Sequence, residues 1–273
     1  MGNTTNIEWC DATFNPWWGC LKVSPGCANC YADTLATRYG FTIWGPAATT
    51  ERRMFGEKHW QEPLRWNTVA AKAGVRKRVF CASMADVFED NPQVEEARFK
   101  LWRLIEATPM LDWLLLTKRP ENIEELVPLC WVDNVPQPNV WYGTSVENQE
   151  QADKRIPILL AVPAVVRFLS CEPLLGPVDL RPYLWEEAGP AWAGLNVADP
   201  GIHWIITGGE SGAKARHCDP AWVRSIRDQC REVNAVVPGA VAFFHKQWGG
   251  RIAKSGGRLL DGRTWDELPS VPV

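Results

Sequence analysis

The sequence predicts an α/β fold built on parallel strands, and three observations support this. Short apolar runs rich in β-branched and aromatic residues recur along the chain, helical patterns separate several of them, and polar, loop-like sequence follows each run. Continuous apolar runs of this length are typical of strands buried on both faces, which is where helical crossovers leave them. The chain has 273 residues, a length at which single α/β barrels are found, so we expect one domain over 1–273.

The predicted strands and helices alternate along the chain. The six apolar runs are 78–81, 113–116, 140–142, 165–169, 202–206 and 241–244. The clearest helix spans Pro92 to Ala107, where apolar residues fall on one face. Further helices are expected at 121–127, 148–160 and 220–233. The last of these is the best delimited, because Asp219 is a good N-cap and Pro220 suits the first helical position.

Three segments lie outside this alternation. Residues 28–39 are expected to form a helix directly after a cysteine-rich loop. Residues 38–66 lack clean periodicity, and we interpret them as a lid-like insertion. Residues 249–273 form a C-terminal extension in which Asp261-Gly262 predicts the turn of a hairpin.

Composition and charge narrow the class of protein. Lysine and arginine number 29 against 32 acidic residues, a net charge of −3, so no global positive field attracts nucleic acid, although a local patch is allowed. No apolar run is long enough to span a bilayer and no secretion signal is visible, which predicts a soluble cytoplasmic protein. Nine cysteines, an odd number, argue against a disulfide framework. The cysteines outside the N-terminal region are expected to be buried. These cysteines are Cys81, Cys130, Cys171, Cys218 and Cys230.

Three cysteines near the N-terminus carry the strongest chemical signal. Cys20, Cys27 and Cys30 are spaced C-x6-C-x2-C within one loop. Thiolates bind soft metals and iron–sulfur clusters. A structural zinc site needs four protein ligands, whereas a four-iron cluster held by three cysteines leaves one iron open. Cys10 is close enough in sequence to be a fourth ligand, although it also suits an ordinary buried position.

Polar residues follow all six predicted strands, where ligands bind in α/β barrels and parallel sheets. These strand ends are Ser83, Asp86 and Asp90, then 117–120, 143–148, 170–173, 207–212 and 245–248. Glycines in 208–212 let backbone amides approach a ligand, although a surface turn would use them equally. Lys118 and Arg119 suit a carboxylate or phosphate, or the start of a solvated helix. Glu147 and Glu172 suit ligand binding, and Glu147 equally suits a helix cap.

Aromatic and basic residues near these segments have two interpretations. Several tryptophans adjoin the candidate site, and exposed rings there would stack on a nucleobase, whereas buried rings would be structural. They are Trp9, Trp17, Trp18, Trp44 and Trp248. The basic clusters 52–53 and 76–78 would contact phosphates or form a solvated face.

Longer motifs resemble a known family over nearly the whole chain. They are 7–9, 15–16, 19–20, 23–27, 30–32, 116–120, 143–147, 172–176, 208–212, 246–249 and 261–263. These residues are similar to an uncharacterised, phage-associated three-cysteine protein family, which is grouped with radical S-adenosylmethionine (SAM) barrels. The resemblance implies a partial (β/α)6 TIM-like barrel of radical SAM type with loop insertions. The usual cysteine spacing in such enzymes is C-x3-C-x2-C, and here the first gap is six residues.

The resemblance also implies a cofactor set. A [4Fe-4S] cluster would be ligated by Cys20, Cys27 and Cys30, and SAM would bind its open iron. By analogy of position, Ser83 and Asp86 would contact the methionine end of SAM. The ribose would be contacted by Thr144, Ser145 and Glu147, and the ligand backbone by Gly208, Gly209, Glu210 and Ser211. The catalytic residues stay unassigned.

The sequence therefore leaves three hypotheses for the function. The first is a radical SAM-like enzyme that generates a 5′-deoxyadenosyl radical, takes electrons from a donor and acts on a nucleotide or nucleic acid. The second is a non-catalytic protein in which a zinc ion or cluster pins the cysteine loop. The third is a barrel enzyme of acid–base chemistry that uses Glu147, Glu172 and Lys246.

Overall fold

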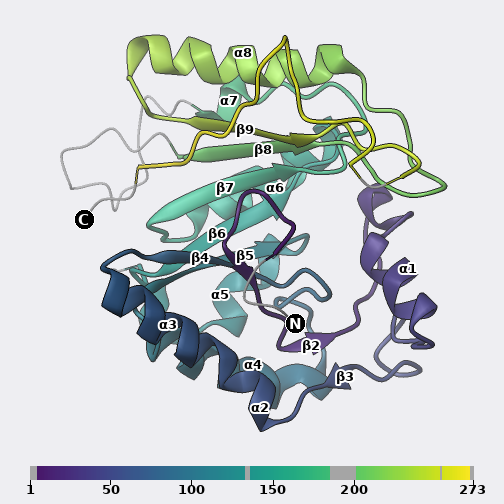
Figure 1. Ribbon diagram of the computed structural model, residues 1–273, viewed down its shortest axis with the longest axis vertical. Coiled ribbons are helices and arrows are strands. Elements are labelled where there is room, and N and C mark those ends of the chain that lie inside the picture. The colour runs from purple at the N-terminus through teal and green to yellow at the C-terminus, as the bar shows by residue number, and fades with distance from the viewer. Residues whose placement is uncertain (1–4, 133–135, 185–200, 253, 271–273) are drawn as a thin grey trace. The chain divides into compact units, whose positions relative to one another are not determined.

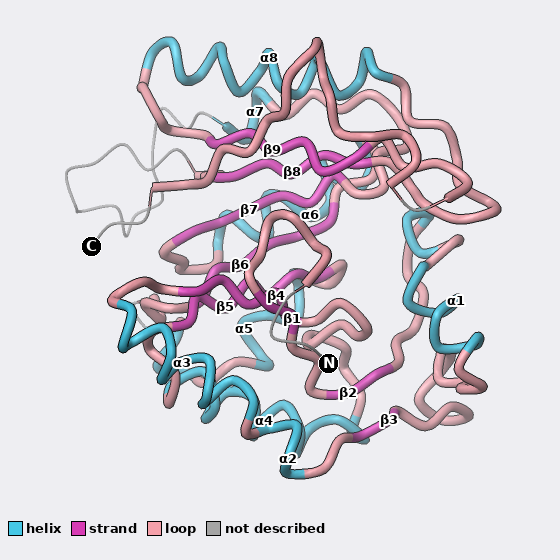
Figure 2. Tube along the Cα trace, viewed as in Figure 1, coloured by secondary structure: helices cyan, strands magenta, loops and turns pink. Residues whose placement is uncertain are grey.

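The structure is a computed structural model that describes residues 5–132, 136–184, 201–252 and 254–270. The chain divides into two compact units, residues 1–141 and 142–273, and each is described by itself. Figure 1 labels the helices and strands, and Figure 2 distinguishes helices, strands and loops by colour.

The first unit is built around parallel strands. β1 (Ala12–Thr13) pairs with β4 (Lys77–Cys81), which pairs with β5 (Leu111–Thr117). The helix α3 (Glu62–Ala73) packs against β4 and β5, and α4 (Glu95–Glu106) connects these two strands. The remaining elements are β2 (Trp17–Trp18), α1 (Tyr31–Arg38), β3 (Arg53–Met54), α2 (Glu57–Trp60) and α5 (Ile123–Leu126).

The second unit continues the same alternation. β7 (Val166–Cys171) pairs in parallel with β8 (Trp204–Gly208), which pairs in parallel with β9 (Ala242–Gln247). Its helices are α6 (Gln149–Ala161), α7 (Arg181–Leu184) and α8 (Pro220–Val236), and α8 packs against β9. The division between the units falls inside β6 (Val140–Ser145). The strand order of the sheet is β1-β4-β5-β6-β7-β8-β9.

The strands β4 to β9 coincide with the six predicted runs, because burial on both faces makes each run continuously apolar. The predicted helix cap is also confirmed, since the Asp219 carboxylate accepts a hydrogen bond from the Ala221 N–H at 2.8 Å. Six helices and strands were not predicted, namely β1, β2, β3, α2, α3 and α7. β1 has only two residues, and α3 begins within the segment 38–66.

The C-terminal extension covers the outer edge of β9. The Trp265 carbonyl accepts from the His245 N–H at 2.9 Å, and the Glu267 N–H donates to the Phe243 carbonyl at 3.3 Å. The chain reaches this edge through the predicted Asp261-Gly262 turn, where both residues have positive φ and Leu260 bridges Arg263. An edge strand with unpaired backbone groups invites aggregation, and this pairing removes that risk. In the described part of the chain, no helix is long and apolar enough to cross a membrane.

His245, on β9, is a buried titratable residue whose backbone bonds to this extension. Its side chain is fully buried, and Nδ1 lies 3.0 Å from the Thr207 hydroxyl oxygen. Nε2 has no hydrogen-bond partner among the described residues. Burial, assisted by the positive charge of Arg258, lowers the pKa of His245 to about 4.

We therefore expect the free energy of unfolding to decrease as the pH falls from 6.5 towards 4. In this window the unfolded chain binds a proton at His245 and the folded protein does not, so stability is lost at up to about 1.4 kcal/mol per pH unit. Urea denaturation between pH 7 and pH 4 measures this slope. His245→Gln should flatten it by one proton, and equal slopes for the two proteins would contradict the assignment.

Candidate metal centre

The cysteine loop is anchored at the carboxyl end of β4. The Gly19 N–H donates to the Met84 carbonyl at 3.0 Å, and Gly19 bridges Ala85 in parallel register. Gly19 has a φ of +115°, and a Cβ there would lie 2.5 Å from the Ile43 carbonyl oxygen. Only glycine fits this entry to the loop. The chain then turns through a short 3-10 helix at Pro25–Cys27 before α1 begins at Tyr31.

The three thiols of this loop are free and partly exposed. Burial, with the charge of Asp86, raises the pKa of Cys20 to about 12, against the opposing effect of Arg119. Burial also raises the pKa of Cys30, which the Asp33 N–H and the charge of Lys118 oppose. The three thiols therefore differ in how easily they ionise.

Cys27 is the thiol of the loop that ionises most easily. Burial would raise the pKa of Cys27, but the positive charge of Lys118 and hydrogen bonds from the backbone of Val23 and Ser24 outweigh it and lower the pKa. The Ser24 hydroxyl oxygen lies 3.9 Å from the Cys27 sulfur. A thiolate is the form that ligates metals, so this end of the loop is prepared for ligation.

Asp86, just after β4, organises the surroundings of Cys20. Its buried carboxylate accepts four hydrogen bonds. The donors are the Thr117 hydroxyl at 2.7 Å, the Phe88 N–H at 3.0 Å, the Lys118 N–H at 3.1 Å and the Arg119 guanidinium at 2.8 Å. These contacts make Asp86 a positioning group for the segment after β5.

Arg119 connects this carboxylate to the cysteine loop. Its guanidinium donates to the Leu21 carbonyl at 2.7 Å and approaches the Cys20 sulfur at 3.8 Å. Only 9% of the Arg119 side chain is exposed, so little water screens the interaction of its charge with its neighbours. Sequence reasoning proposed Arg119 as a ligand-binding residue, whereas the structure uses it to hold the loop.

Ser83 lies in the same unit and joins the loop to β4. The Asn15 side-chain amide donates to the Ser83 hydroxyl at 3.1 Å, and the Tyr31 hydroxyl donates to the Ser83 carbonyl at 2.7 Å. Tyr31 directly follows Cys30, so this bond fixes the start of α1 near the end of β4. Neither Asn15 nor Tyr31 was predicted as a site residue, although both lie in the motifs that carry the family resemblance.

The donor set fits an iron–sulfur cluster, although the thiols are not gathered around a centre. Three free thiols lie on one loop, and cationic groups act on all of them, which suits the negative charge of a thiolate-bound cluster. Among the described residues, no three Cys, His, Asp or Glu side chains are grouped closely enough to hold a metal ion. Cys10, the alternative fourth ligand, is buried, and its sulfur contacts the Ile7 carbonyl at 3.8 Å.

In the second unit, the predicted glutamates Glu147 and Glu172 are held in ion pairs. Glu147 is fully buried and accepts from Arg155 of α6 at 2.8 Å. Glu172 pairs with Lys246 of β9 at 2.9 Å. Thr144 and Ser145, on β6, are buried. Two of the three residues proposed for acid–base chemistry therefore neutralise each other.

The glycines of 208–212 make room for other parts of the protein. A Cβ on Gly208 would lie 2.5 Å from the Glu172 carboxylate, and one on Gly209 would lie 1.9 Å from the Trp248 carbonyl oxygen. Glu210 is held by Arg216, which donates to it at 2.7 Å, and Ser211 accepts from Gln247 at 3.2 Å. The backbone of residues 208–212 therefore packs closely against the backbone of the segment after β9.

Burial decides which of the predicted aromatic and basic residues could contact a ligand and which are structural. Trp9, Trp17 and Trp18 are buried and structural, whereas Trp44 and Trp248 are partly exposed. Arg52 is also buried and pairs with Glu89 at 2.5 Å, so it cannot contact a phosphate. Cys130, which was expected to be buried, is exposed.

The fold is shared with solved structures of a radical SAM enzyme, spore photoproduct lyase. A cysteine-to-serine mutant matches with a TM-score of 0.50 and 11% identity, over 90% of this chain and 79% of that chain. A double mutant with bound AdoMet and dinucleoside spore photoproduct gives a TM-score of 0.48 and 12% identity, over 88% and 77%. The first likeness shows the fold, and it confirms the expected partial α/β barrel of radical SAM type.

The chain itself belongs to a family described as proteins of unknown function, DUF5131. The family profile matches residues 4–269, which is nearly the whole chain. No curated protein matches it. The expected membership of an uncharacterised family is thus confirmed.

The shifted thiol pKa values predict an order of alkylation. In cluster-free protein, Cys27 should react with iodoacetamide at lower pH than Cys30, and Cys20 should react last, because the thiolate is the nucleophile. Mass spectrometry of peptides labelled between pH 6 and pH 10 measures this order. Lys118→Gln should move the Cys27 curve to higher pH and leave that of Cys130 unchanged, whereas simultaneous labelling of Cys20 and Cys27 would contradict the pKa order.

The buried position of Asp86 predicts a large effect of its neutralisation. Asp86→Asn leaves the Arg119 charge without its carboxylate, which should cost about 3–5 kcal/mol in free energy of unfolding. Asp33→Asn is the matched control, because Asp33 pairs with Lys22 at the surface and such pairs contribute up to about 1 kcal/mol. Urea denaturation measures both variants, and equal effects would rule out the organising role of Asp86.

Proposed function

We propose that this protein is a radical SAM-like iron–sulfur enzyme whose [4Fe-4S] cluster is ligated by Cys20, Cys27 and Cys30. One observation carries the proposal. Three free, partly exposed thiols lie on a single loop that is anchored at the carboxyl end of β4. The carboxyl ends of parallel strands are where α/β barrels bind their ligands. The fold of the chain, that of a radical SAM enzyme, supports the same assignment.

The number of thiols defines what the cluster would supply. Three protein ligands leave one iron of a [4Fe-4S] cluster open. With SAM held at that iron, a reduced cluster would supply the electron that cleaves a carbon–sulfur bond of SAM into methionine and a 5′-deoxyadenosyl radical. The electron donor, the phage association and the cytoplasmic location stay predictions.

The residues of the first unit would hold and shield the cluster. Arg119 would keep the Cys20 side of the loop in place, and Asp86 would hold Arg119 in position. Lys118 would stabilise the thiolate of Cys27 electrostatically. Because all four oxygen contacts of Asp86 go to the protein, we assign it to positioning and retain Ser83 for the methionine end of SAM.

The remaining cofactor contacts are proposed from their position after parallel strands. These residues are Thr144, Ser145, Glu147, Gly208, Gly209, Glu210 and Ser211. In the second unit, Glu147 and Glu210 accept hydrogen bonds from arginines, which fixes both side chains. A fixed carboxylate can accept a further hydrogen bond from a ribose hydroxyl without losing its partner.

Anaerobic reconstitution tests the ligand assignment. The wild-type protein should bind about four irons per chain and show the brown absorbance of a cluster. Cys27→Ala should lose the cluster, because two cysteines do not hold it. Cys130→Ala, which removes an exposed cysteine outside the loop, should keep it. Stoichiometric zinc without iron, or full iron in Cys27→Ala, would contradict the proposal.

A further inference from the structure

Arg53 lies among three aromatic rings, and its strand β3 pairs with β2, which directly precedes the cysteine loop. Its guanidinium carbon is 4.7 Å from the ring centroid of Trp18, 4.2 Å from that of Phe41 and 5.3 Å from that of Phe55. We call Trp18, Phe41, Arg53 and Phe55 the Arg53 cage. Trp18 is the antiparallel pairing partner of Arg53 in β2 and β3. The rings hold the guanidinium in place before any ligand binds.

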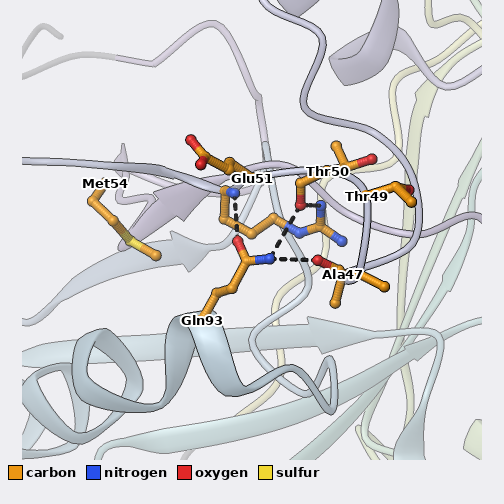
Figure 3. A pocket seen from close by; sticks show the side chains of 8 residues that line it. Ala47, Thr49, Thr50, Glu51, Met54 and Gln93 are labelled. Carbon is orange, nitrogen blue, oxygen red and sulfur yellow. Dashed lines mark hydrogen bonds between the residues drawn. The ribbon is translucent and has the colours of Figure 1, made fainter.

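The residues on either side of Arg53 have a different environment. Arg52 and Met54 line a cavity of about 630 Å³ together with residues 47–51 and Gln93 (Figure 3). Inside it, the Gln93 side chain bonds the backbone of Ala47 and Arg52 at 2.6 and 3.0 Å, so the polar groups satisfy one another. Arg52 also pairs with Glu89. Arg53 points away from this cavity, as the alternation along a strand requires.

The Arg53 cage has donors without acceptors. Within the described residues, the Arg53 guanidinium contacts the three rings and makes no hydrogen bond or ion pair. A stacked guanidinium with unused N–H groups matches the bidentate geometry of a phosphate. The cage therefore favours an anionic ligand rich in acceptors.

An exposed ring adjoins the cage. Tyr39, at the end of α1, is 61% exposed and stacks on Trp18, with centroids 6.5 Å apart and an angle of 26° between the rings. An exposed ring backed by a buried one is a rigid surface on which a nucleobase can stack. Arg38, beside it, is exposed, whereas the nearby acid Asp33 is neutralised by Lys22. Glu51 is the remaining acid of this region, so the local charge is slightly positive.

We infer that the Arg53 cage and Tyr39 form a subsite for single-stranded nucleic acid, with Arg53 on a phosphate and Tyr39 under a base. The subsite is continuous with the cysteine loop, because Trp18 and Cys30 belong to one apolar cluster. It deepens the proposed function by naming the substrate class, and it rests on that function only for the chemistry that follows binding. A local subsite also reconciles nucleic-acid binding with a net charge of −3.

Fluorescence anisotropy with a short single-stranded DNA tests the phosphate contact. Arg53→Gln should weaken binding by about 10-fold or more, since hydrogen bonds to charged groups are worth about 1.5–3 kcal/mol. It should also reduce the slope of log K against log salt by about one. Arg103→Gln is the matched control, because Arg103 lies over a single exposed ring, Phe99, at 6.0 Å. Equal effects of the two variants on affinity and slope would overturn the inference.

Two further variants distinguish the contact with the base from the contact with the phosphate. Tyr39→Ala should weaken binding of the DNA but leave binding of an abasic strand unchanged, because stacking needs a base. Arg53→Lys should keep the salt slope and lose part of the affinity, because the charge stays but the planar fork is lost. Circular dichroism of each variant confirms folding. Equal loss of both strands in Tyr39→Ala would contradict the stacking role.

The same assays on cluster-free protein distinguish this inference from the proposed function. The subsite consists of side chains of the fold, so DNA binding should persist without iron. A protein that takes up iron normally but whose DNA binding is insensitive to Arg53→Gln would refute the subsite alone. A protein that binds no iron but shows the Arg53 effect would support the subsite and refute the cluster.

Discussion

The buried carboxylate of Asp86 is the contact on which the cysteine loop depends. A charge so little exposed must be neutralised or hydrogen-bonded, and four donors from two segments surround it. Because Arg119 bonds both this carboxylate and the Leu21 carbonyl, the segments after β4 and β5 and the cysteine loop form one network. The Cys20 end of the loop is thus held by an ion pair formed by residues 33 positions apart.

The second unit applies the same principle at its strand ends. Glu147, Glu172 and Glu210 each pair with a basic side chain, and the glycines before Glu210 allow two backbone segments to approach closely. The polar residues that follow the parallel strands therefore serve first to fix the conformation of the loops. Residues that are fixed in this way are also the ones that can present an oriented group to a ligand.

The fold could largely be predicted from the sequence, because local signals specify it. Each buried strand contains a run of mainly apolar residues, Asp219-Pro220 starts a helix and Asp261-Gly262 makes a turn. The site was predicted less completely. The cysteines are recognisable by spacing alone, but the roles of Arg119 and Asp86 arise from long-range pairing. Adjacent Arg52 and Arg53 have identical side chains, and only strand alternation in the folded chain gives them opposite environments.

The proposed cluster has an open iron at which SAM would bind. The most direct measurement is the reductive cleavage of SAM by the reconstituted protein, with dithionite as electron source. The account predicts formation of 5′-deoxyadenosine and methionine in equal amounts, because the radical acquires one hydrogen atom after cleavage. An intact four-iron cluster that leaves SAM uncleaved under these conditions would contradict it.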